Sequence, residues 1–422
     1  MFKKYDAYKD SGVEWLGPLP NSWELLSNKY IFKLKKDLVG KKSKDYELLS
    51  LTLNGVIKRD MENPEGKFPA EFDTYQKVNV GDFIFCHFDV EETPRTVGLS
   101  TFNGMITGAY TVYEVDKNFF DSKFLYYFYL NLDVGKRLKP LYKGLRNTIG
   151  KDVFGNFETF IPTKDEQNEI VKFLDQKTSE IDQAIALKEQ QISLLNERKQ
   201  IVIQKAVTQG LNPNVPMKDS GVEWIGQIPE HWDCKPSRYV FRAVKRFKRD
   251  GTEIKFSVTQ KWGVIPTDEM KESSTQAESF NGFQICLEDD LVLNKYKAHL
   301  GVFWRAPSRG LITGNYTVFE PLKDISSKYF ELLYHTSVYI DIFRTIVYGI
   351  VEGMMPLYNN DFYDMQSIVP PFNEQLDIVK FVENEQRKFS SIENVYLSQI
   401  EKLKEYKITL INDAVTGKIK VI

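Results

Sequence analysis

The chain has 422 residues, of which 42% are hydrophobic and 27% charged, so it can fill the cores of two or three globular domains. Its formal net charge of −2 weighs against a free-standing DNA-binding protein, which usually carries a basic excess, unless basic residues cluster locally or partners supply them. No run of about 18 apolar residues and no apolar signal region occur, so no membrane segment is expected. Three scattered cysteines favour a cytoplasmic location.

An internal repeat is the main signal along the chain. Residues 9–15 (KDSGVEW) recur unchanged at residues 218–224, an offset of 209 (218 minus 9). Further matches at nearly the same offset pair residues 106–114 with 312–320, 162–167 with 370–375, and 206–208 with 414–416. The chain therefore reads as one unit used twice.

The two copies differ strongly between these matches, because residues 33–80 and 242–287 share little. A repeated scaffold with divergent inserts suggests two heads that have one architecture and two specificities. The alternative is an old duplication whose copies have drifted without acquiring separate roles.

Each copy begins with a head of mixed α+β character. Apolar runs entered from turns predict strands, and apolar residues at helical spacing predict helices. Strands are expected at residues 82–88 and 106–115 of the first head and at 290–294 and 312–320 of the second, with helices at 124–138 and 329–346.

One long helix follows each head. Residues 164–208 and 373–416 contain no proline or glycine, and Gly210 and Gly417 stand just beyond them, where a left-handed C-terminal cap is expected. Apolar residues at alternating four- and three-residue steps predict a coiled-coil seam on both helices. The predicted seam consists of Ile181, Ile185, Ile192, Leu195 and Val202 on the first helix and of Phe389, Ile400, Leu403 and Leu410 on the second.

A helix of about 40 residues is roughly 60 Å long, and such a seam needs a partner along its length. The nearest partner is the other copy, and antiparallel packing would return the chain to the first head. The predicted fold class is α+β, with two pseudo-symmetric mixed α/β heads separated by two long antiparallel coiled-coil helices. The expected domains are an N-terminal repeated segment (1–25), a first head (26–162), a spacer helix (163–209), a linker with the repeated segment (210–233), a second head (234–371), a second spacer helix (372–417) and a C-terminal tail (418–422).

Several motifs fit this organisation. They are the opening SGVEW(L/I)G of each copy, residues 81–84 (GDFI) with 289–292 (DDLV), residues 295–301 (KYKAHLG), the pattern P-x-x-x-E-Q-x-x-I before each long helix, and residues 414–419 (AVTGKI). With these motifs, essentially the whole chain resembles the specificity (S) subunit of type I restriction–modification enzymes.

The resemblance implies that each head is a target recognition domain that reads one half of an interrupted, asymmetric DNA sequence. It implies that two modification subunits, which use S-adenosylmethionine, bind around the helices, and that restriction subunits join to form the nuclease. It implies that this chain is not an enzyme and has no cofactor of its own.

Motifs for catalysis are weak. Residues 369–372 (VPPF) approach the Pro-Pro-aromatic motif of adenine methyltransferases, but Val369 cannot hydrogen-bond a flipped base, and no glycine-rich cofactor loop precedes it. The two prolines are better explained as a stop before the long helix. Cys86 and His87 lack a second ligand pair, which favours a core pair over a metal site. No catalytic or metal-ligating residue is therefore predicted.

Basic residues cluster at residues 33–44 and 242–249, which are matching stretches of the two heads, and again at 136–151. Such clusters can bind phosphates, while Arg and Lys pair with guanine edges and Asn and Gln with adenine edges. The candidate DNA contacts are the turn residues Asn54, Lys58, Arg59, Gln260 and Lys261, the cluster residues Lys143 and Arg146, and, from the family resemblance, Lys295, Lys297 and Arg305.

Two other functions remain open. The chain could be a coiled-coil structural adaptor with two protein-binding heads, or a methyltransferase that acts alone. Salt-dependent DNA binding in the presence of a partner would argue against the adaptor, and methyl transfer by the single chain would support the methyltransferase.

Overall fold

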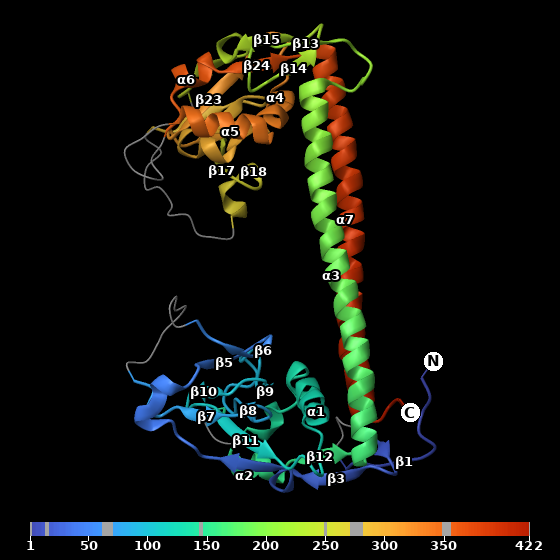
Figure 1. The fold of residues 1–422 in the computed structure, drawn as a ribbon. Helices are drawn as coiled ribbons and strands as arrows, with labels where there is room; N and C mark the ends of the chain where they lie inside the picture. Colours follow the sequence, from blue (N-terminus) through green and yellow to red (C-terminus); the bar gives the residue numbers. More distant parts are fainter. Residues whose placement is uncertain are drawn as a thin grey trace. The chain divides into compact units, whose positions relative to one another are not determined.

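The computed structural model describes residues 2–12, 17–60, 71–142, 147–248, 251–270, 282–347 and 356–421. The chain divides into two compact units (Figure 1). Unit 1 combines Met1–Lys188 with Leu397–Ile422, and unit 2 is Glu189–Tyr396. Each unit contains one head and one half of each long helix. No helix in the described part of the chain is both long and apolar enough to cross a membrane.

The predicted long helices are confirmed as α3 (Lys164–Gln209) and α7 (Phe372–Val415). The first half of α3 lies in unit 1 with the second half of α7, so the two helices are antiparallel. An ion pair joins them there, because Lys407 Nζ donates to both carboxylate oxygens of Asp182 at 2.7 and 2.6 Å.

The residues of the predicted seam are buried or half-buried. Ile181, Ile185, Phe389, Ile400 and Leu410 are buried, and Ile192, Leu195, Val202 and Leu403 are half-buried. Gly210 and Gly417 follow the two helices with φ values of +80° and +73°, as expected for left-handed caps.

The head of unit 1 is built on an antiparallel four-stranded sheet in the order β4-β11-β8-β9. These strands are β4 (Phe32–Lys35), β11 (Thr111–Val115), β8 (Phe83–Phe85) and β9 (Val97–Leu99). Shorter antiparallel pairs are β1 (Tyr8–Lys9) with β2 (Leu19–Pro20), β3 (Glu24–Ser27) with β12 (Glu158–Ile161), β5 (Leu49–Thr52) with β6 (Gly55–Lys58), and β7 (Gln76–Val78) with β10 (Gly104–Ile106). The head helices are α1 (Ser122–Val134) and α2 (Lys151–Asn156).

The head of unit 2 repeats this sheet in the order β16-β23-β20-β21. Its strands are β16 (Phe241–Val244), β23 (Tyr316–Pro321), β20 (Leu291–Asn294) and β21 (Phe303–Arg305). A second sheet, β18-β17-β22-β19, contains β18 (Gly263–Pro266), β17 (Ile254–Thr259), β22 (Gly310–Ile312) and β19 (Gln284–Cys286). The remaining elements are β13 (Met217–Asp219) paired with β14 (Gln227–Pro229), β15 (Asp233–Pro236) paired with β24 (Gln366–Val369), and the helices α4 (Ser327–Tyr334), α5 (Ser337–Ile346) and α6 (Asn359–Asp364).

The repeated Ile-Thr-Gly segment is a turn, not the interior of a strand. The single strands predicted at 106–115 and 312–320 are therefore wrong, because the first residue of each ends one strand and a new strand starts beyond the glycine. A Cβ atom at Gly108 would lie 2.8 Å from the carbonyl oxygen of Thr74, and one at Gly314 would lie 2.5 Å from that of Gly282. The close approach of another backbone segment explains the glycine at both positions.

The single helix predicted at 329–346 is also wrong, since α4 and α5 are separate helices. Thr336 interrupts them with an extended backbone (φ −69°, ψ 151°), and its Oγ1 donates to Leu333 O at 2.7 Å. A threonine hydroxyl that bonds the backbone in this way favours a helix boundary over a helix interior.

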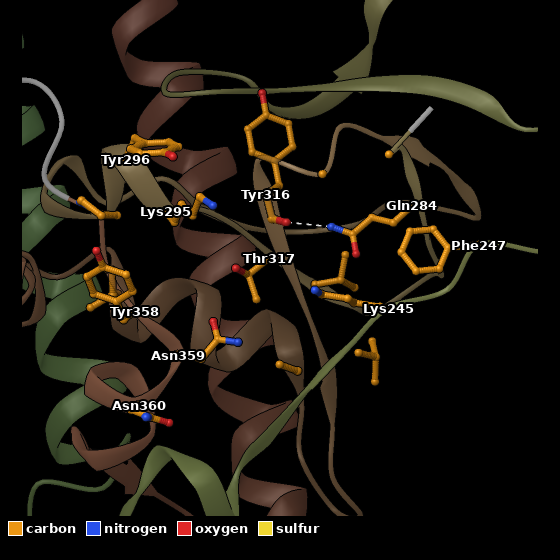
Figure 2. Close-up of a pocket in the computed structure, with 17 residues that line it drawn as sticks. Lys245, Phe247, Gln284, Lys295, Tyr296, Tyr316, Thr317, Tyr358, Asn359 and Asn360 are labelled. Atoms are coloured by element: carbon orange, nitrogen blue, oxygen red, sulfur yellow. Dashed lines mark hydrogen bonds between the residues drawn. The ribbon is translucent and has the colours of Figure 1, made fainter. Parts of the chain in front are cut away.

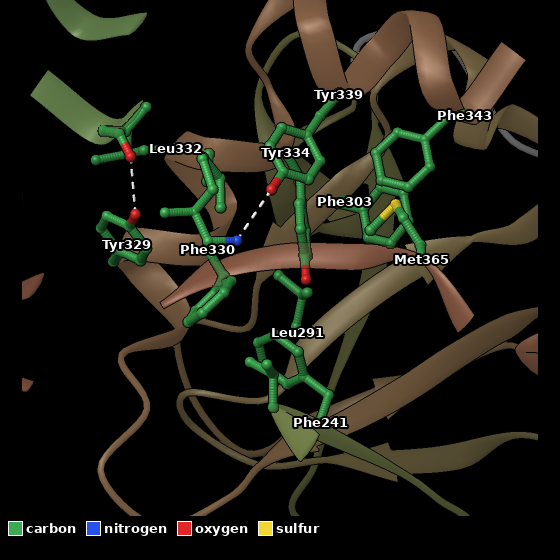
Figure 3. Packing of buried hydrophobic residues seen from close by; sticks show 14 of the residues in the cluster. Phe241, Leu291, Phe303, Tyr329, Phe330, Leu332, Tyr334, Tyr339, Phe343 and Met365 are labelled. Atoms are coloured by element: carbon green, nitrogen blue, oxygen red, sulfur yellow. Dashed lines mark hydrogen bonds between the residues drawn. The ribbon is translucent and has the colours of Figure 1, made fainter. Parts of the chain in front are cut away.

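Aromatic side chains dominate the core of unit 2 (Figure 3). Phe303 stacks on Phe343 with ring centroids 4.6 Å apart, and Tyr334 meets Phe343 edge-on at 5.8 Å. Fully burying each such side chain stabilises the fold by about 1.5–3 kcal/mol. The long helices join the same core through Ile203, Ala206 and Val207 of α3 and Ile378 and Val382 of α7.

A buried glutamine joins the head of unit 1 to α3. Gln167 is fully buried, its Oε1 accepts from the Asp121 N–H at 2.7 Å, and its Nε2 donates to Pro162 O at 3.0 Å. Because Asp121 is the N-cap of α1, this one side chain connects the start of α1 to the first turn of α3.

The same joint occurs in unit 2. Gln375 Oε1 accepts from the N–H of Ser326, the N-cap of α4, at 2.9 Å, and its Nε2 donates to Pro370 O at 2.9 Å. The preceding Glu374 accepts from Trp232 Nε1 at 3.0 Å. The repeated Pro-x-x-x-Glu-Gln pattern is thus the joint between head and helix, and the prolines precede the helices as predicted.

Candidate nucleic-acid interface

A hairpin in the head of unit 1, formed by β5 and β6, carries three of the predicted contact residues. Thr52 Oγ1 donates to Gly55 O at 3.1 Å and accepts from the Asn54 N–H at 3.2 Å, and Gly55 has a φ of +89°. This turn leaves Asn54 exposed at the tip. Lys58 ends β6 and is exposed, and Arg59, the next residue, is half-buried. The three side chains therefore belong to one hairpin, with Asn54 at its tip and Lys58 and Arg59 at its other end, where Lys58 pairs with Leu49.

The corresponding hairpin in unit 2 is formed by β17 and β18. Thr259 Oγ1 donates to Gly263 O at 3.1 Å and accepts from the Trp262 N–H at 2.9 Å, and Gly263 has a φ of +77°. Gln260, Lys261 and Trp262 are exposed in this turn. The two hairpins thus share one hydrogen-bonding pattern although their sequences share little.

A second candidate surface in unit 2 is a hollow of about 790 Å³ beside β16 and β23 (Figure 2). Lys245 and Lys295 bring positive charge to it, and Gln284 Nε2 donates to Tyr316 O at 2.7 Å. Lysine side chains can bind phosphates, while amides and aromatic rings can bind bases. The remaining polar and aromatic side chains that line it include Phe247, Tyr296, Thr317, Tyr358, Asn359 and Asn360.

Sequence reasoning named Lys295 and the cluster that holds Lys245, but it missed the aromatic and amide residues of this hollow. They come from distant segments, including residues 243–247, 295–296, 314–318 and 356–360, which only strand pairing and the packing of α6 bring together. The one local signal in the sequence is Tyr358-Asn-Asn360, which stands at the start of the short helix α6.

Several basic residues of the predicted clusters are already paired. In unit 1, Lys35 Nζ lies 2.6 Å from Asp82 Oδ2, and both side chains are largely buried. In unit 2, Arg246 Nη1 lies 2.5 Å from Asp290 Oδ2. Burial raises the pKa of Asp290, even though Arg246 and the Leu287 N–H both hydrogen-bond its carboxylate. These two cations hold strands together and are poorly placed for phosphates.

Other cations remain exposed. Arg242 is exposed and bonded to Glu320 at 2.6 Å, and this hydrogen bond lowers the pKa of the Glu320 carboxyl group. The exposed lysines of the two clusters, which are better placed to meet phosphates, are Lys33, Lys36, Lys41, Lys42 and Lys44 in unit 1 and Lys245 and Lys248 in unit 2.

The residues proposed from the family resemblance do not gather at one place. Arg305 Nη1 lies 2.5 Å from Asp289 Oδ1, in a hollow next to the start of α7 and not in the hollow of Lys295. Lys297 is exposed in the short 3₁₀ helix Lys295–Leu300. Lys143 and Arg146, like Arg249 of the second basic cluster, lie outside the described residues.

The Cys86–His87 pair lies in the core of unit 1, in agreement with the predicted core pair. His87 is 7% exposed, and its ring lies 4.7 Å from that of Phe154 and 5.6 Å from that of Phe85. Burial lowers its pKa to about 4, so the imidazole is neutral. Within the described ranges, no group of three or more His, Cys, Asp or Glu residues is arranged to hold a metal ion.

Neither a protein-family model nor a curated protein matches the chain. Solved structures do match it over nearly its whole length. One belongs to a study of complex assembly and conformational transition of the type I R-M system; it is 11% identical, covers 94% of this chain and 98% of its own, and has a TM-score of 0.63. Another is the HsdS subunit from Thermoanaerobacter tengcongensis, which is 12% identical, covers 95% and 98%, and has a TM-score of 0.54. The chain therefore has the fold of type I restriction–modification specificity subunits.

Proposed function

We propose that this chain is the DNA sequence-specificity subunit of a type I restriction–modification complex. Each head reads one half of a bipartite, asymmetric DNA site, and the long helices set the spacing between the half-sites. The observation that carries the proposal is a repeated scaffold whose two heads project hairpins of the same construction but different sequence. The specificity-subunit fold over 94% of the chain supports it and does not favour the adaptor.

The contact residues are proposed in two roles. Exposed lysines bind phosphates, which fixes the position of a head on the duplex without reading sequence. Side chains of the two hairpins reach base edges in a groove. The proposed base contacts are Asn54, Lys58 and Arg59 in unit 1 and Gln260 and Lys261 in unit 2, with Lys295 acting from the neighbouring hollow.

The long helices are proposed to dock two methyltransferase subunits, which bind S-adenosylmethionine, and restriction subunits join this assembly. Leu187, Leu194 and Ile201 recur every seven residues along α3 and are 60%, 56% and 58% exposed. Apolar residues at heptad spacing outside the α3–α7 seam suit packing against a further helix. In this assembly the chain itself is non-catalytic, and the partners supply methyl transfer and DNA cleavage.

Mapping methylated sites in a host with and without this chain tests the proposal. One bipartite methylation motif should disappear when the chain is removed. Replacing residues 26–160 with the first head of another such subunit should change one half of the motif and leave the other half intact. An unchanged methylome without the chain would refute the specificity role, whereas changes in both halves would refute separate reading by the heads.

A further inference from the structure

Each hairpin also presents a large apolar side chain at its tip. Leu53 is 64% exposed in the β5–β6 turn, and Trp262 is 68% exposed in the β17–β18 turn. Both stand between the threonine and the glycine that define the turn. Single exposed apolar residues are common on proteins, but the same feature recurs at corresponding tips of two heads that otherwise differ in sequence.

The head of unit 1 holds its tip in place through a buried carboxylate. Arg95 Nη2 donates to Leu53 O at 3.2 Å, and Arg95 Nη1 donates to Asp133 Oδ2 at 3.3 Å. Asp133, near the end of α1, also accepts from the Thr96 N–H at 3.0 Å and from Thr96 Oγ1 at 2.7 Å. The Leu53 backbone is thus fixed to the head core, which lowers the entropic cost of binding through the tip.

The head of unit 2 supports its tip with an aromatic ring. A Cβ atom at Gly263 would lie 3.3 Å from the indole ring of Trp304, so the turn backbone packs on that ring. The ring centroid of Trp304 in turn lies 4.2 Å from that of His335, the residue directly after α4. The two heads therefore support corresponding tips by different chemistry.

Positive charge adjoins both tips. Lys261 Nζ lies 5.5 Å from the centre of the Trp262 ring, and the guanidinium group of Arg95, which is also paired with Asp133, bonds the Leu53 carbonyl. An apolar side chain beside a cation fits a nucleic acid, because phosphates bind the cation while thymine methyl groups and the faces of unstacked bases offer apolar surface.

We propose that Leu53 and Trp262 enter a groove of the half-site that their head reads and contact apolar base surfaces there. Such a surface is either a thymine methyl group or the face of a base step that the tip partly unstacks. In this arrangement Lys261 binds the neighbouring phosphate. The inference rests on the proposed DNA-reading function and assigns a specificity-determining residue to each hairpin.

The assembled modification complex with a fluorescent cognate duplex tests this assignment. Trp262→Ala should weaken binding roughly tenfold or more without changing the salt slope of log K, because no cation is lost. Trp262→Phe should keep most of the affinity, and Lys261→Ala should lower the salt slope by about one. The matched control is Tyr239→Ala, an aromatic in the same head that is 63% exposed, which should bind as the wild type does.

Base substitutions then separate the two kinds of contact. If the tip meets a thymine methyl group, replacing one thymine of that half-site by uracil weakens the wild type but not Trp262→Ala. If the tip unstacks a base step, 2-aminopurine beside that step brightens with the wild type and stays dark with Trp262→Ala.

The inference fails if Trp262→Ala binds and selects DNA as the wild type does, or if its only defect is failed assembly with the methyltransferase subunits, which would make the tip a protein contact. Failure of the proposed function is a different result, because the wild-type complex would then show no sequence preference at all.

Discussion

His87 is a buried titratable residue that makes the stability of the head of unit 1 depend on pH. Its Nε2 has no hydrogen-bond partner in the described part of the chain, and burial lowers its pKa from the usual 6.5 to about 4. The unfolded chain therefore takes up a proton near pH 6.5, whereas the folded head does so only near pH 4. The contribution of neutral His87 to the free energy of unfolding is fully present above pH 6.5 and is lost progressively as the pH falls toward 4.

We expect this one residue to reduce the free energy of unfolding by about 2 kcal/mol between pH 7 and pH 5. His87→Phe, which suits the surrounding aromatic rings, should remove that part of the pH dependence. Urea unfolding of both proteins at the two pH values measures it. An equal pH dependence in wild type and variant would show that His87 is not responsible.

At the scale of single residues, the sequence located the turn residues but not their surroundings. Asn54, Gln260 and Lys261 were predicted as turn residues, and they lie in turns because a Thr and a Gly close each hairpin. The same prediction was wrong for Lys58 and Arg59, because Lys58 ends β6 at the far end of the hairpin and Arg59 follows it. Tyr296 and Tyr358 could not be found, since nothing local in the sequence shows that they line one hollow. The ion pairs of Lys35 and Arg246 were equally hidden, because their partners lie more than 40 positions away.

At the scale of elements, the joint between α1 and α3 permits a direct test. Gln167→Leu keeps the volume of the side chain but removes both polar atoms, which leaves the Asp121 N–H and the Pro162 carbonyl unpaired inside the protein. An unpaired buried polar group costs about 1–3 kcal/mol. We expect a loss of at least about 2 kcal/mol in the free energy of unfolding of unit 1.

Urea unfolding again provides the measurement. Gln176→Ala is the matched control, because Gln176 is an exposed glutamine of the same helix whose Nε2 bonds Glu180 at 2.8 Å, and its loss should cost little. Equal stability of the two variants would mean that Gln167 does not hold the joint.

The elements also differ in how far the sequence could predict them. The two long helices were predicted almost to the residue, because more than 40 positions without proline or glycine and a repeated apolar seam leave no alternative. The strands of the heads are between two and six residues long, which is too short for an alternating pattern to show where one ends. The turn at Gly108 was missed for this reason, since its cause is a carbonyl from a distant segment.

At the scale of the whole molecule, the small net charge is compatible with DNA binding because the cations are distributed unevenly. Lysines gather on exposed segments of the heads, while acidic residues directly before the inner strands β8 and β20, Asp82 and Asp290, neutralise cations that are already largely buried. The sequence could predict two units from its repeat, but it could not show which cations remain available to a partner.

Helix α3 leads from unit 1 into unit 2, and the boundary falls between Lys188 and Glu189. Four residues inserted after Glu189 would lengthen α3 by roughly 6 Å and rotate the following seam by only about 40°, because a helix turns about 100° per residue. Two inserted residues would rotate it by about 200° and turn Leu195 and Val202 away from α7. If the helices set the spacing, the four-residue variant should methylate the same half-sites with a gap longer by about one or two base pairs, since each base pair adds about 3.4 Å. The two-residue variant should lose activity because its seam no longer packs. Methylome sequencing of both variants decides the matter: an unchanged gap in the four-residue variant, or normal methylation by the two-residue variant, would show that α3 does not measure the distance between the half-sites.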